Sequence, residues 1–597
     1  MSTINRRGFV KGMFATSTIA LSALSLHGQT SKSKVLKHVK DEVEILTGKV
    51  FNLIIDYSVV NFTGKDVIAT TINNSITAPT LIWEEGDEIT LNVTNNLNED
   101  TSIHWHGIIL PFEMDGVPGI SFDGIKPGET FTYKFKVQQT GTYWYHSHSD
   151  FQEQTGMYGA IVIKSKEKEY YSYDNDYVIT LSDWSDENPN SIYRKLKLMS
   201  DYYNFNQRTA SDFFSEVKEK GFFEAFSQRK MWNEMNMMDR DISDVTGYTY
   251  TYLLNGKSSK NKWKKLFSEG ERIRLRFINA AAMTFFDVRI PGLKMTVVST
   301  DGNDVKPVIV DEFRIGVAET YDVIVEPSEY KAYAIFAQSI DRSGYALGVL
   351  TCDESLKVDI PKMDNPQSLE HKDMGMSHSD HTSMDMNNNI AMDHSSMDMK
   401  NMDHSKHMQH MDHSSMDMSN NDDKKWPITT LPFKEGIQTT MKVENPQYRL
   451  NDPGVGLRNN GRRVLTYADL RNIYSTKHDP IPNREIVLHL TGNMERYMWS
   501  INGIKHADSE PLLFKYGERL RITFVNDTMM NHPMHLHGMW SDLETGDNDF
   551  LVRKHTVIVQ PGSKISFRVT VDAKGAWAFH CHLIYHMPGM FRTVVVK

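Results

Sequence analysis

The sequence has few cysteines, no long apolar runs beyond its start and no excess of basic charge, and each lack excludes a class of protein. Only two of its 597 residues are cysteines, Cys352 and Cys581, so disulfide bonds do not build the fold. No run of 18 apolar residues occurs beyond residue 30, which excludes a polytopic membrane protein. The formal net charge is -10, whereas a nucleic-acid-binding protein normally presents a basic face.

Methionine and histidine are frequent instead. The chain has 33 methionines and 24 histidines, and its apolar fraction of 40% is that of a globular protein. Thioether and imidazole groups are both copper ligands. The positions of these methionines and histidines in the sequence therefore decide whether it predicts copper binding.

The first 28 residues are typical of an export signal. Arg6 and Arg7 precede a short apolar stretch at 13–26, and small residues follow. The arginine pair, with Phe9 and Lys11, resembles a bacterial twin-arginine signal. The alternative is a short amphipathic helix or membrane anchor, but the apolar stretch is too short to span a bilayer comfortably. We therefore expect export to the periplasm and leave residues 1–28 out of the fold prediction.

The remainder predicts an all-β protein with an internal repeat. Valine-, isoleucine- and threonine-rich runs alternate with turn residues, and one pattern of glycine, acidic residue, alternating strand and asparagine begins at Gly86, Gly270 and Gly517. In the first and third copies a histidine lies 18 residues after the glycine, whereas the second copy has Val288 there. We expect three β-units, at residues 45–166, 170–356 and 431–597.

A low-complexity insert separates the second and third units, within a linker at 357–430. Residues 363–421 contain 13 methionines and 8 histidines, without apolar periodicity. Such a composition predicts a disordered segment. A plain spacer needs neither residue type, so we expect this tract to bind labile copper in addition to any copper in the folded units.

Four His-x-His pairs predict a metal cluster. Residues i and i+2 of a strand point to the same face, so each pair directs two imidazoles at one place. A single pair can arise by chance, but these four occupy equivalent positions in the first and third units. Eight imidazoles exceed what one metal binds, and they suit a three-metal cluster between those units. They are His104, His106, His146, His148, His535, His537, His580 and His582.

The third unit carries a further ligand set. Cys581 stands where the first unit has Ser147, and His532 stands where it has Thr101. With His586 and a weak axial Met590, these residues form the set of two histidines, a cysteine and a methionine that holds blue copper. Cys352 has no histidine nearby and is expected to be an ordinary small apolar residue.

These motifs resemble those of the three-domain multicopper oxidases. The segments carrying them begin at His104, His146, His532 and His580, and the likeness covers about residues 45–597. The signal, the segments 111–118 and 244–250, and the Met/His tract resemble the bacterial periplasmic copper-resistance oxidases most. The resemblance implies three cupredoxin-like Greek-key domains and four copper ions. It places type 1 copper at His532, Cys581, His586 and Met590, type 2 at His104 and His535, and a type 3 pair at His106, His146, His148, His537, His580 and His582.

The resemblance also implies a proton-handling role for Asp115, near the cluster. The alternative is a turn residue before Gly116, because Asp-Gly favours turns. Two features depart from the family pattern. The loop from His586 to Met590 is one residue shorter, with Met587 as a poorer axial candidate. Met587 also stands where some members have an acidic residue after the second type 1 histidine.

The electron donor is expected to be Cu(I). Metal-oxidising family members use methionine and aspartate near the type 1 site, and two groups here fit that description: Asp527, Met529 and Met530, and Met231, Met235 and Met238. Core packing is the alternative for both. The predicted function is an exported enzyme that couples Cu(I) oxidation to reduction of O2 to water in copper tolerance, alongside periplasmic copper-handling partners. The alternatives are a laccase-like phenol oxidase and a copper-sequestering protein.

Overall fold

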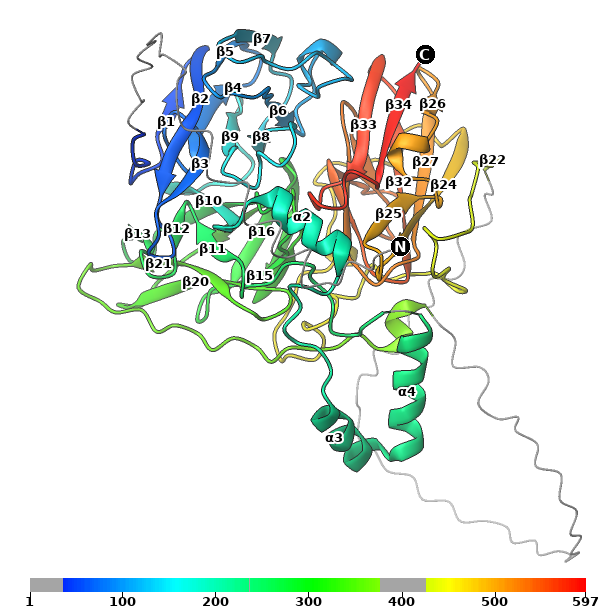
Figure 1. Cartoon of the computed structure of the whole chain (residues 1–597). Helices are drawn as coiled ribbons and strands as arrows, with labels where there is room; N and C mark the ends of the chain where they lie inside the picture. Colours follow the sequence, from blue (N-terminus) through cyan, green and yellow to red (C-terminus); the bar gives the residue numbers. More distant parts are fainter. Residues whose placement is uncertain (1–35, 236, 376–425) are drawn as a thin grey trace, which may run out of the picture. The chain divides into compact units, whose positions relative to one another are not determined.

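The computed structural model describes residues 36–235, 237–375 and 426–597 (Figure 1). Strands make up 40% of the chain and helices 9%, so the prediction of an all-β protein is confirmed. Among the described residues no helix is long and apolar enough to cross a membrane. The predicted signal at 1–28 lies outside the described residues, as does most of the Met/His tract.

The first unit consists of two facing sheets, with strand orders β1-β4-β9-β8-β6 and β3-β2-β5-β7. Short strand β6 pairs with β8 so that His104 lies opposite His146. The strands are β1 Ile45–Thr47, β2 Val50–Val60, β3 Val67–Ile72, β4 Ala78–Glu84, β5 Glu88–Asn95, β6 His104–His106, β7 Thr130–Lys136, β8 Gly141–His146 and β9 Tyr158–Lys164, with the 3-10 helix η1 Phe112–Met114.

The second unit has the sheet orders β12-β11-β10-β14-β19-β16-β17 and β13-β21-β20-β15-β18. A helical segment between β10 and β11 comprises α2 Pro189–Leu198, α3 Ala210–Lys220 and α4 Phe222–Glu234. The strands are β10 Asn175–Trp184, β11 Thr251–Leu254, β12 Lys257–Ser258, β13 Trp263–Leu266, β14 Ile273–Asn279, β15 Phe286–Arg289, β16 Met295–Thr300, β17 Asn303–Val310, β18 Glu312–Ile315, β19 Thr320–Val325, β20 Ala332–Ser339 and β21 Tyr345–Thr351.

The third unit has the orders β22-β24-β27-β32-β29-β30, with β23 and β25 attached, and β26-β34-β33-β28-β31. Its strands are β22 Ile428–Thr429, β23 Gln447–Tyr448, β24 Arg484–Asn493, β25 Met498–Ile501, β26 Leu512–Phe514, β27 Arg519–Asn526, β28 His532–Leu536, β29 Ser541–Leu543, β30 Val552–Lys554, β31 Thr556–Val559, β32 Ser563–Thr570, β33 Gly575–Cys581 and β34 Phe591–Val596. The 3-10 helices η2 His371–Met374, η3 Tyr467–Asp469 and η4 His506–Asp508 lie between strands.

The sequence repeat has a structural basis. Its three glycines have φ angles of 78°, 76° and 83°, a backbone conformation that favours glycine, and each precedes a central strand. The asparagine that ends each of these strands donates a side-chain hydrogen bond to a backbone carbonyl of the next loop; these residues are Asn95, Asn279 and Asn526. The loop so closed leads to β6, β15 or β28. In β15 the equivalent residue is Val288, which is fully buried and fills the core.

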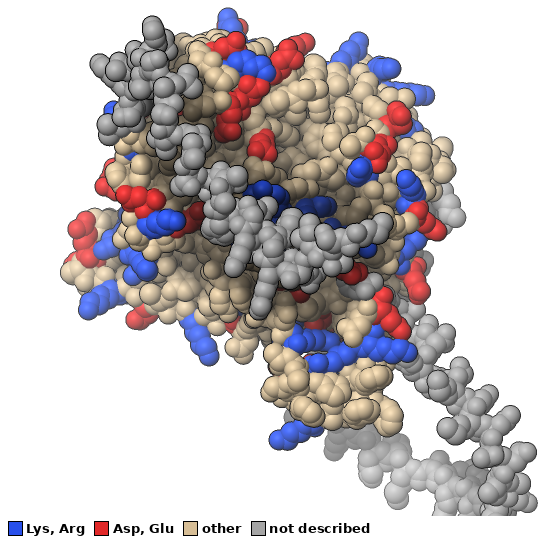
Figure 2. Space-filling view, viewed as in Figure 1, with Lys and Arg blue, Asp and Glu red and all other residues tan. Residues whose placement is uncertain are grey.

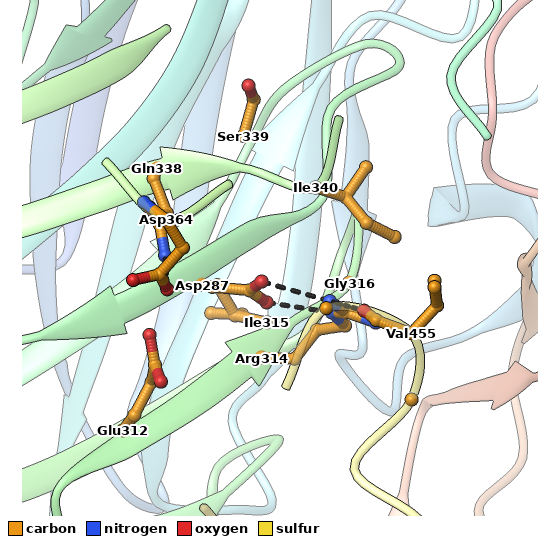
Figure 3. A network of polar contacts seen from close by, with 12 residues as sticks. Asp287, Glu312, Arg314, Ile315, Gly316, Gln338, Ser339, Ile340, Asp364 and Val455 are labelled. Carbon is orange, nitrogen blue, oxygen red and sulfur yellow. Dashed lines mark hydrogen bonds and ion pairs between the residues drawn. The ribbon is translucent and has the colours of Figure 1, made fainter. Parts of the chain in front are cut away.

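Part of the predicted insert is folded, which corrects its N-terminal boundary. Asp364 accepts hydrogen bonds from Arg289 and Gln338 of the second unit, and Met374 is fully buried. A neighbouring polar network joins the second unit to the 449–465 segment: Arg314 donates to both carboxylate oxygens of Asp287 and to the carbonyl of Val455 (Figure 3). These bonds arise from pairs far apart in sequence, so composition alone did not reveal that residues 363–375 are ordered.

Charged side chains of both signs are interspersed over the face drawn in Figure 2. This distribution agrees with the absence of basic excess in the sequence.

Candidate metal centre

The structure brings all eight predicted cluster histidines together between the first and third units. Among the described residues, the donor atoms of His106, His146 and His582 lie within 4.8 Å of one another, and so do those of His148, His537 and His580. The rings of His104 and His535 lie 5.7 Å apart beside these two groups. The eight side chains therefore form one site, in which all but the half-buried His148 are buried.

Strand pairing explains this convergence. In the first unit His104 is opposite His146 across β6 and β8, and in the third unit His535 is opposite His580 across β28 and β33. Because alternate residues share a face of a strand, the second histidine of each pair points the same way as the first. The two units present these faces to each other.

One nitrogen of most rings is fixed by a hydrogen bond, which leaves the other free for a metal. His104 Nδ1 lies 2.7 Å from the carbonyl of Asp115, and His537 Nδ1 lies 2.9 Å from a carboxylate oxygen of the same residue. His535 Nδ1 lies 2.6 Å from the carbonyl of His555. Asp115, predicted from the family resemblance, thus contacts one cluster ligand from each unit.

Burial keeps the rings neutral. It lowers the pKa of six imidazoles well below the ordinary value, reinforced by the neighbouring histidines, and it lowers the pKa of His580 to about 4. The six are His106, His146, His148, His535, His537 and His582. Neutral imidazole is the form that binds metals, so these rings need not lose a proton at neutral pH.

The donor set fits copper. Buried polar atoms normally have hydrogen-bond partners, and an unpartnered one requires an explanation. Here the buried Nε2 atoms of His104, His106, His146, His535 and His582 have none. A cluster of unpartnered imidazole nitrogens is what a site that binds soft or borderline metals presents.

A second site lies around Cys581. Its Sγ is 3.5 Å from Nδ1 of His532 and 3.9 Å from Nδ1 of His586, and the two nitrogens are 3.4 Å apart. Bonds of about 2.0–2.3 Å to one central ion place three donors roughly 3.5–4 Å apart in a plane. This triangle therefore fits a trigonal copper bound by two histidines and a cysteine.

The far nitrogens of the two histidines are also fixed. His532 Nε2 lies 2.7 Å from Thr528 Oγ1, and His586 Nε2 lies 2.7 Å from Oδ2 of Asp244. Trp499 stacks on His586, with ring centroids 3.8 Å apart. Burial raises the pKa of the Cys581 thiol, so without a metal it stays protonated. Binding of a metal would release that proton.

Comparison with known proteins shows the family of this chain. Family profiles described as multicopper oxidase match residues 55–168, 175–355 and 479–597. "Copper resistance protein A" of Escherichia coli is 52% identical to this chain, over 99% of each. The chain belongs to the multicopper oxidase family.

A second copper resistance protein and two solved structures are also similar to this chain. "Copper resistance protein A homolog" of Pseudomonas syringae pv. tomato is 51% identical over 99% of each chain. Among solved structures, Fet3p, a multicopper oxidase that functions in iron import, superposes with a TM-score of 0.60 at 18% identity, covering 92% of this chain and 91% of its own. A laccase from Botrytis aclada gives 0.59 at 20%, covering 93% and 88%. These structural likenesses concern the fold, which is that of three cupredoxin-like units.

The two groups of residues predicted to bind substrate copper differ in their structural surroundings. Met529 and Met530 are 1% and 3% exposed, and the Asp527 carboxylate lies 2.7 Å from His489 Nδ1. This placement favours core packing for that group. In the other group, helical spacing would place Met231, Met235 and Met238 on one face. The structure corrects this: α4 ends at Glu234, so Met231 and Met235 are one turn apart, but Met238 lies beyond the helix.

Sequence reasoning missed three side chains at the two centres. Asp244 comes from the second unit and contacts His586. Glu153 is fully buried, with one oxygen 2.9 Å from His146 Nδ1 and the other 3.9 Å from His582 Nδ1. His555 lies beside His106, with ring centroids 4.7 Å apart. Glu153 follows His148 by only five residues, and Asp244 begins the segment 244–250 of the family resemblance, which gave it no role; His555 lies outside every motif.

The predicted role of Met590 as the weak axial ligand of type 1 copper can be tested directly. It is fully buried, and its backbone bonds to Cys581 and His586. We expect Met590→Leu to yield a protein that is still blue, because His532, Cys581 and His586 remain. Its type 1 reduction potential should rise, because loss of a weak donor disfavours Cu(II). Redox titration measures this, and an unchanged potential would show that Met590 is not the axial ligand.

Proposed function

We propose that this chain is an exported multicopper oxidase that oxidises Cu(I) with O2 in copper tolerance. Its relatives at 51–52% identity are copper resistance proteins, which supports the copper-tolerance role. The observation that carries the choice of Cu(I) is the contact between Asp244 and His586, at the edge of a loop rich in methionine and buried carboxylate.

The proposed copper sites follow the predicted ligand sets: one type 1, one type 2 and a type 3 pair, four ions in all. Copper held by His532, Cys581 and His586 would supply one-electron acceptance, and copper held by the eight cluster histidines would supply the reduction of O2 to water. Cys581 lies between His580 and His582, so one short stretch of backbone joins the two centres. Asp115 holds His104 and His537 in orientation and is the proposed source of protons near the cluster.

The loop from Met235 to Asp244 has the chemistry of a Cu(I) docking site. Met235 and Met237 are each 8% exposed, and the Met238 sulfur accepts a weak hydrogen bond from Asn204 at 3.9 Å. Thioethers are soft ligands that favour Cu(I). These methionines belong to the same loop as Asp244, which contacts the type 1 histidine His586.

Two buried carboxylates of this loop would stabilise a cation. Asp241 and Asp244 are 5% and 2% exposed, and each has one unpartnered oxygen. Burial, and then the charge of Asp244, raise the pKa of Asp241 well above its ordinary value. A cation that displaces the proton of Asp241 would relieve this repulsion, whereas a neutral phenol would not.

The test is Asp244→Asn, which keeps the shape of the side chain and its ability to bond His586. We expect kcat/KM for Cu(I) to fall about tenfold, as for one lost charge contact. Oxidation of a phenol should change much less. Initial-rate O2 uptake with each donor measures both, and Asp508→Asn, an exposed carboxylate in η4, is the matched control.

Three outcomes separate the candidate functions. A selective loss with Cu(I) supports a cuprous oxidase. An equal loss with both donors would contradict the docking role of this loop and favour a laccase-like enzyme. Stoichiometric copper binding without O2 uptake would leave copper sequestration as the function.

The remaining proposals concern location and organisation. Export to the periplasm by the twin-arginine route rests on residues 1–28, and labile copper binding rests on the Met/His tract. Both lie wholly or mostly outside the described residues. The unit boundaries at 45–166, 170–356 and 431–597 are proposed from the repeat, with β22 at Ile428–Thr429 just before the third.

A further inference from the structure

A ninth imidazole lies at the cluster, and none of the motifs includes it. His555 lies between β30 and β31 and is 2% exposed. Its ring is nearly perpendicular to that of His106, with centroids 4.7 Å apart, and nearly perpendicular to that of His535 at 5.9 Å. The donor atoms of these three histidines lie within 4.8 Å of one another.

The second unit fixes the backbone that carries this ring. One carboxylate oxygen of Asp301, in the turn between β16 and β17, accepts the N–H groups of His555 and Thr556 at 3.1 Å each. The carbonyl of His555 in turn lies 2.6 Å from His535 Nδ1. The position of the His555 ring is thus tied both to the copper-free unit and to a cluster ligand.

The contacts of the two His555 ring nitrogens differ. Nδ1 lies 3.2 Å from the Thr556 hydroxyl but 3.6 Å from the Asp301 carboxylate, and the longer separation is not a hydrogen bond. A hydroxyl can donate or accept; in the tautomer on which the proposal rests, it donates to Nδ1 and the neutral ring carries its proton on Nε2. That Nε2 is buried and has no partner.

A small cavity adjoins this part of the cluster. Its volume is about 10 Å³, and His104, His535, His537 and His555 contribute to its lining, together with Trp540. Nε2 is unpartnered in His104, His535 and His555. A cavity of this size accommodates about one water molecule, provided that two to four polar groups contact it. His555 Nε2 supplies one such group, and a metal held by His104 and His535 would supply a second.

We propose that His555 donates a hydrogen bond from Nε2 to one small ligand, a water, hydroxide or small anion, held in this cavity beside the type 2 position. The inference rests on the proposed assignment of His104 and His535 to type 2 copper. It makes His555 a binding residue of the outer side of the cluster, and Asp301 the residue that positions it. The eight motif histidines remain the metal ligands.

Fluoride is a suitable probe, because it is a small anion and accepts hydrogen bonds. We would titrate it into the copper-loaded full-length protein and follow the type 2 signal by electron paramagnetic resonance. In His555→Leu, which fills similar space without a donor, fluoride affinity should fall roughly tenfold, the effect of one hydrogen bond. His555→Gln retains an N–H donor and should recover part of that loss. His478→Ala, an exposed histidine, is the control and should match the wild type.

The intense blue colour of the type 1 site reports in each variant that the third unit is folded. Equal fluoride affinity in the wild type and His555→Leu would overturn the proposal. Loss of the type 2 signal from both the Leu and Gln variants would also overturn it, because His555 would then be a metal ligand or a structural residue. A wild-type protein without a type 2 signal would instead contradict the proposed ligand assignment.

Discussion

Replacement of Cys581 by serine is expected to abolish both the intense blue colour and the oxidase activity. A serine hydroxyl cannot replace the soft thiolate that, with His532 and His586, completes the triangle of donors 3.4–3.9 Å apart. The substitution also removes the sulfur through which electrons would enter the backbone that leads to His580 and His582. Turnover with either Cu(I) or a phenol should therefore fall to the background rate.

The cluster should survive this substitution, because none of its eight imidazoles is altered. Metal analysis should find one copper fewer per chain, and the type 2 resonance should persist. Cys352→Ser is the matched control: that thiol lies at the end of β21, 3.7 Å from the carbonyl of Lys331 and away from every candidate ligand. It should leave colour and activity unchanged. A blue, active Cys581→Ser protein would refute the type 1 assignment.

Of the substitutions proposed for this chain, Lys554→Met is expected to lower the free energy of unfolding most. The Lys554 ammonium is fully buried between Asp301 and Glu319, at 3.1 and 3.0 Å. Burial alone would lower the pKa of Lys554, but these two carboxylates raise it, so the side chain stays charged. Methionine would leave both carboxylates buried without their cation, which costs about 3–5 kcal/mol. Calorimetry should show the unfolding transition about 5 °C lower, since the second and third units together unfold with a large entropy.

Lys134→Met is the control for this substitution. Lys134 pairs with Glu88 at 2.9 Å, but both side chains are more than half exposed, and such surface pairs contribute little. Its transition should coincide with that of the wild type. A Lys554→Met protein as stable as this control would show that the buried network does not join the second and third units energetically.

The ligand sets were visible in the sequence because each depends on spacing within one strand or one repeat. His104 and His106 share a strand face by the two-residue period, and the recurrence 18 residues after Gly86 and Gly517 identified the equivalent histidines. The type 1 set was readable for the same reason, since Cys581 and His586 lie five residues apart. The fold class followed from the same alternation.

The residues that surround these ligands were not readable in the same way. Asp244 contacts His586 across 342 positions, and Asp301 contacts Thr556 across 255. Each comes from the second unit, which has none of the His-x-His pairs; Asp244 begins the segment 244–250 of the family resemblance, but that segment did not indicate a contact with a ligand. The folded residues 363–375 were assigned to a disordered insert for a similar reason, because the partners of Asp364 lie in other segments.

The central claim is that one enzyme oxidises Cu(I) at its type 1 site and reduces O2 to water at its cluster. The most direct measurement is the amount of O2 consumed per Cu(I) oxidised by the full-length protein, with peroxide assayed in parallel. Reduction of O2 to two waters takes four electrons, so we predict one O2 for every four Cu(I) and no peroxide. One O2 for every two Cu(I) with accumulating peroxide, or no uptake above the Cys581→Ser background, would contradict the account.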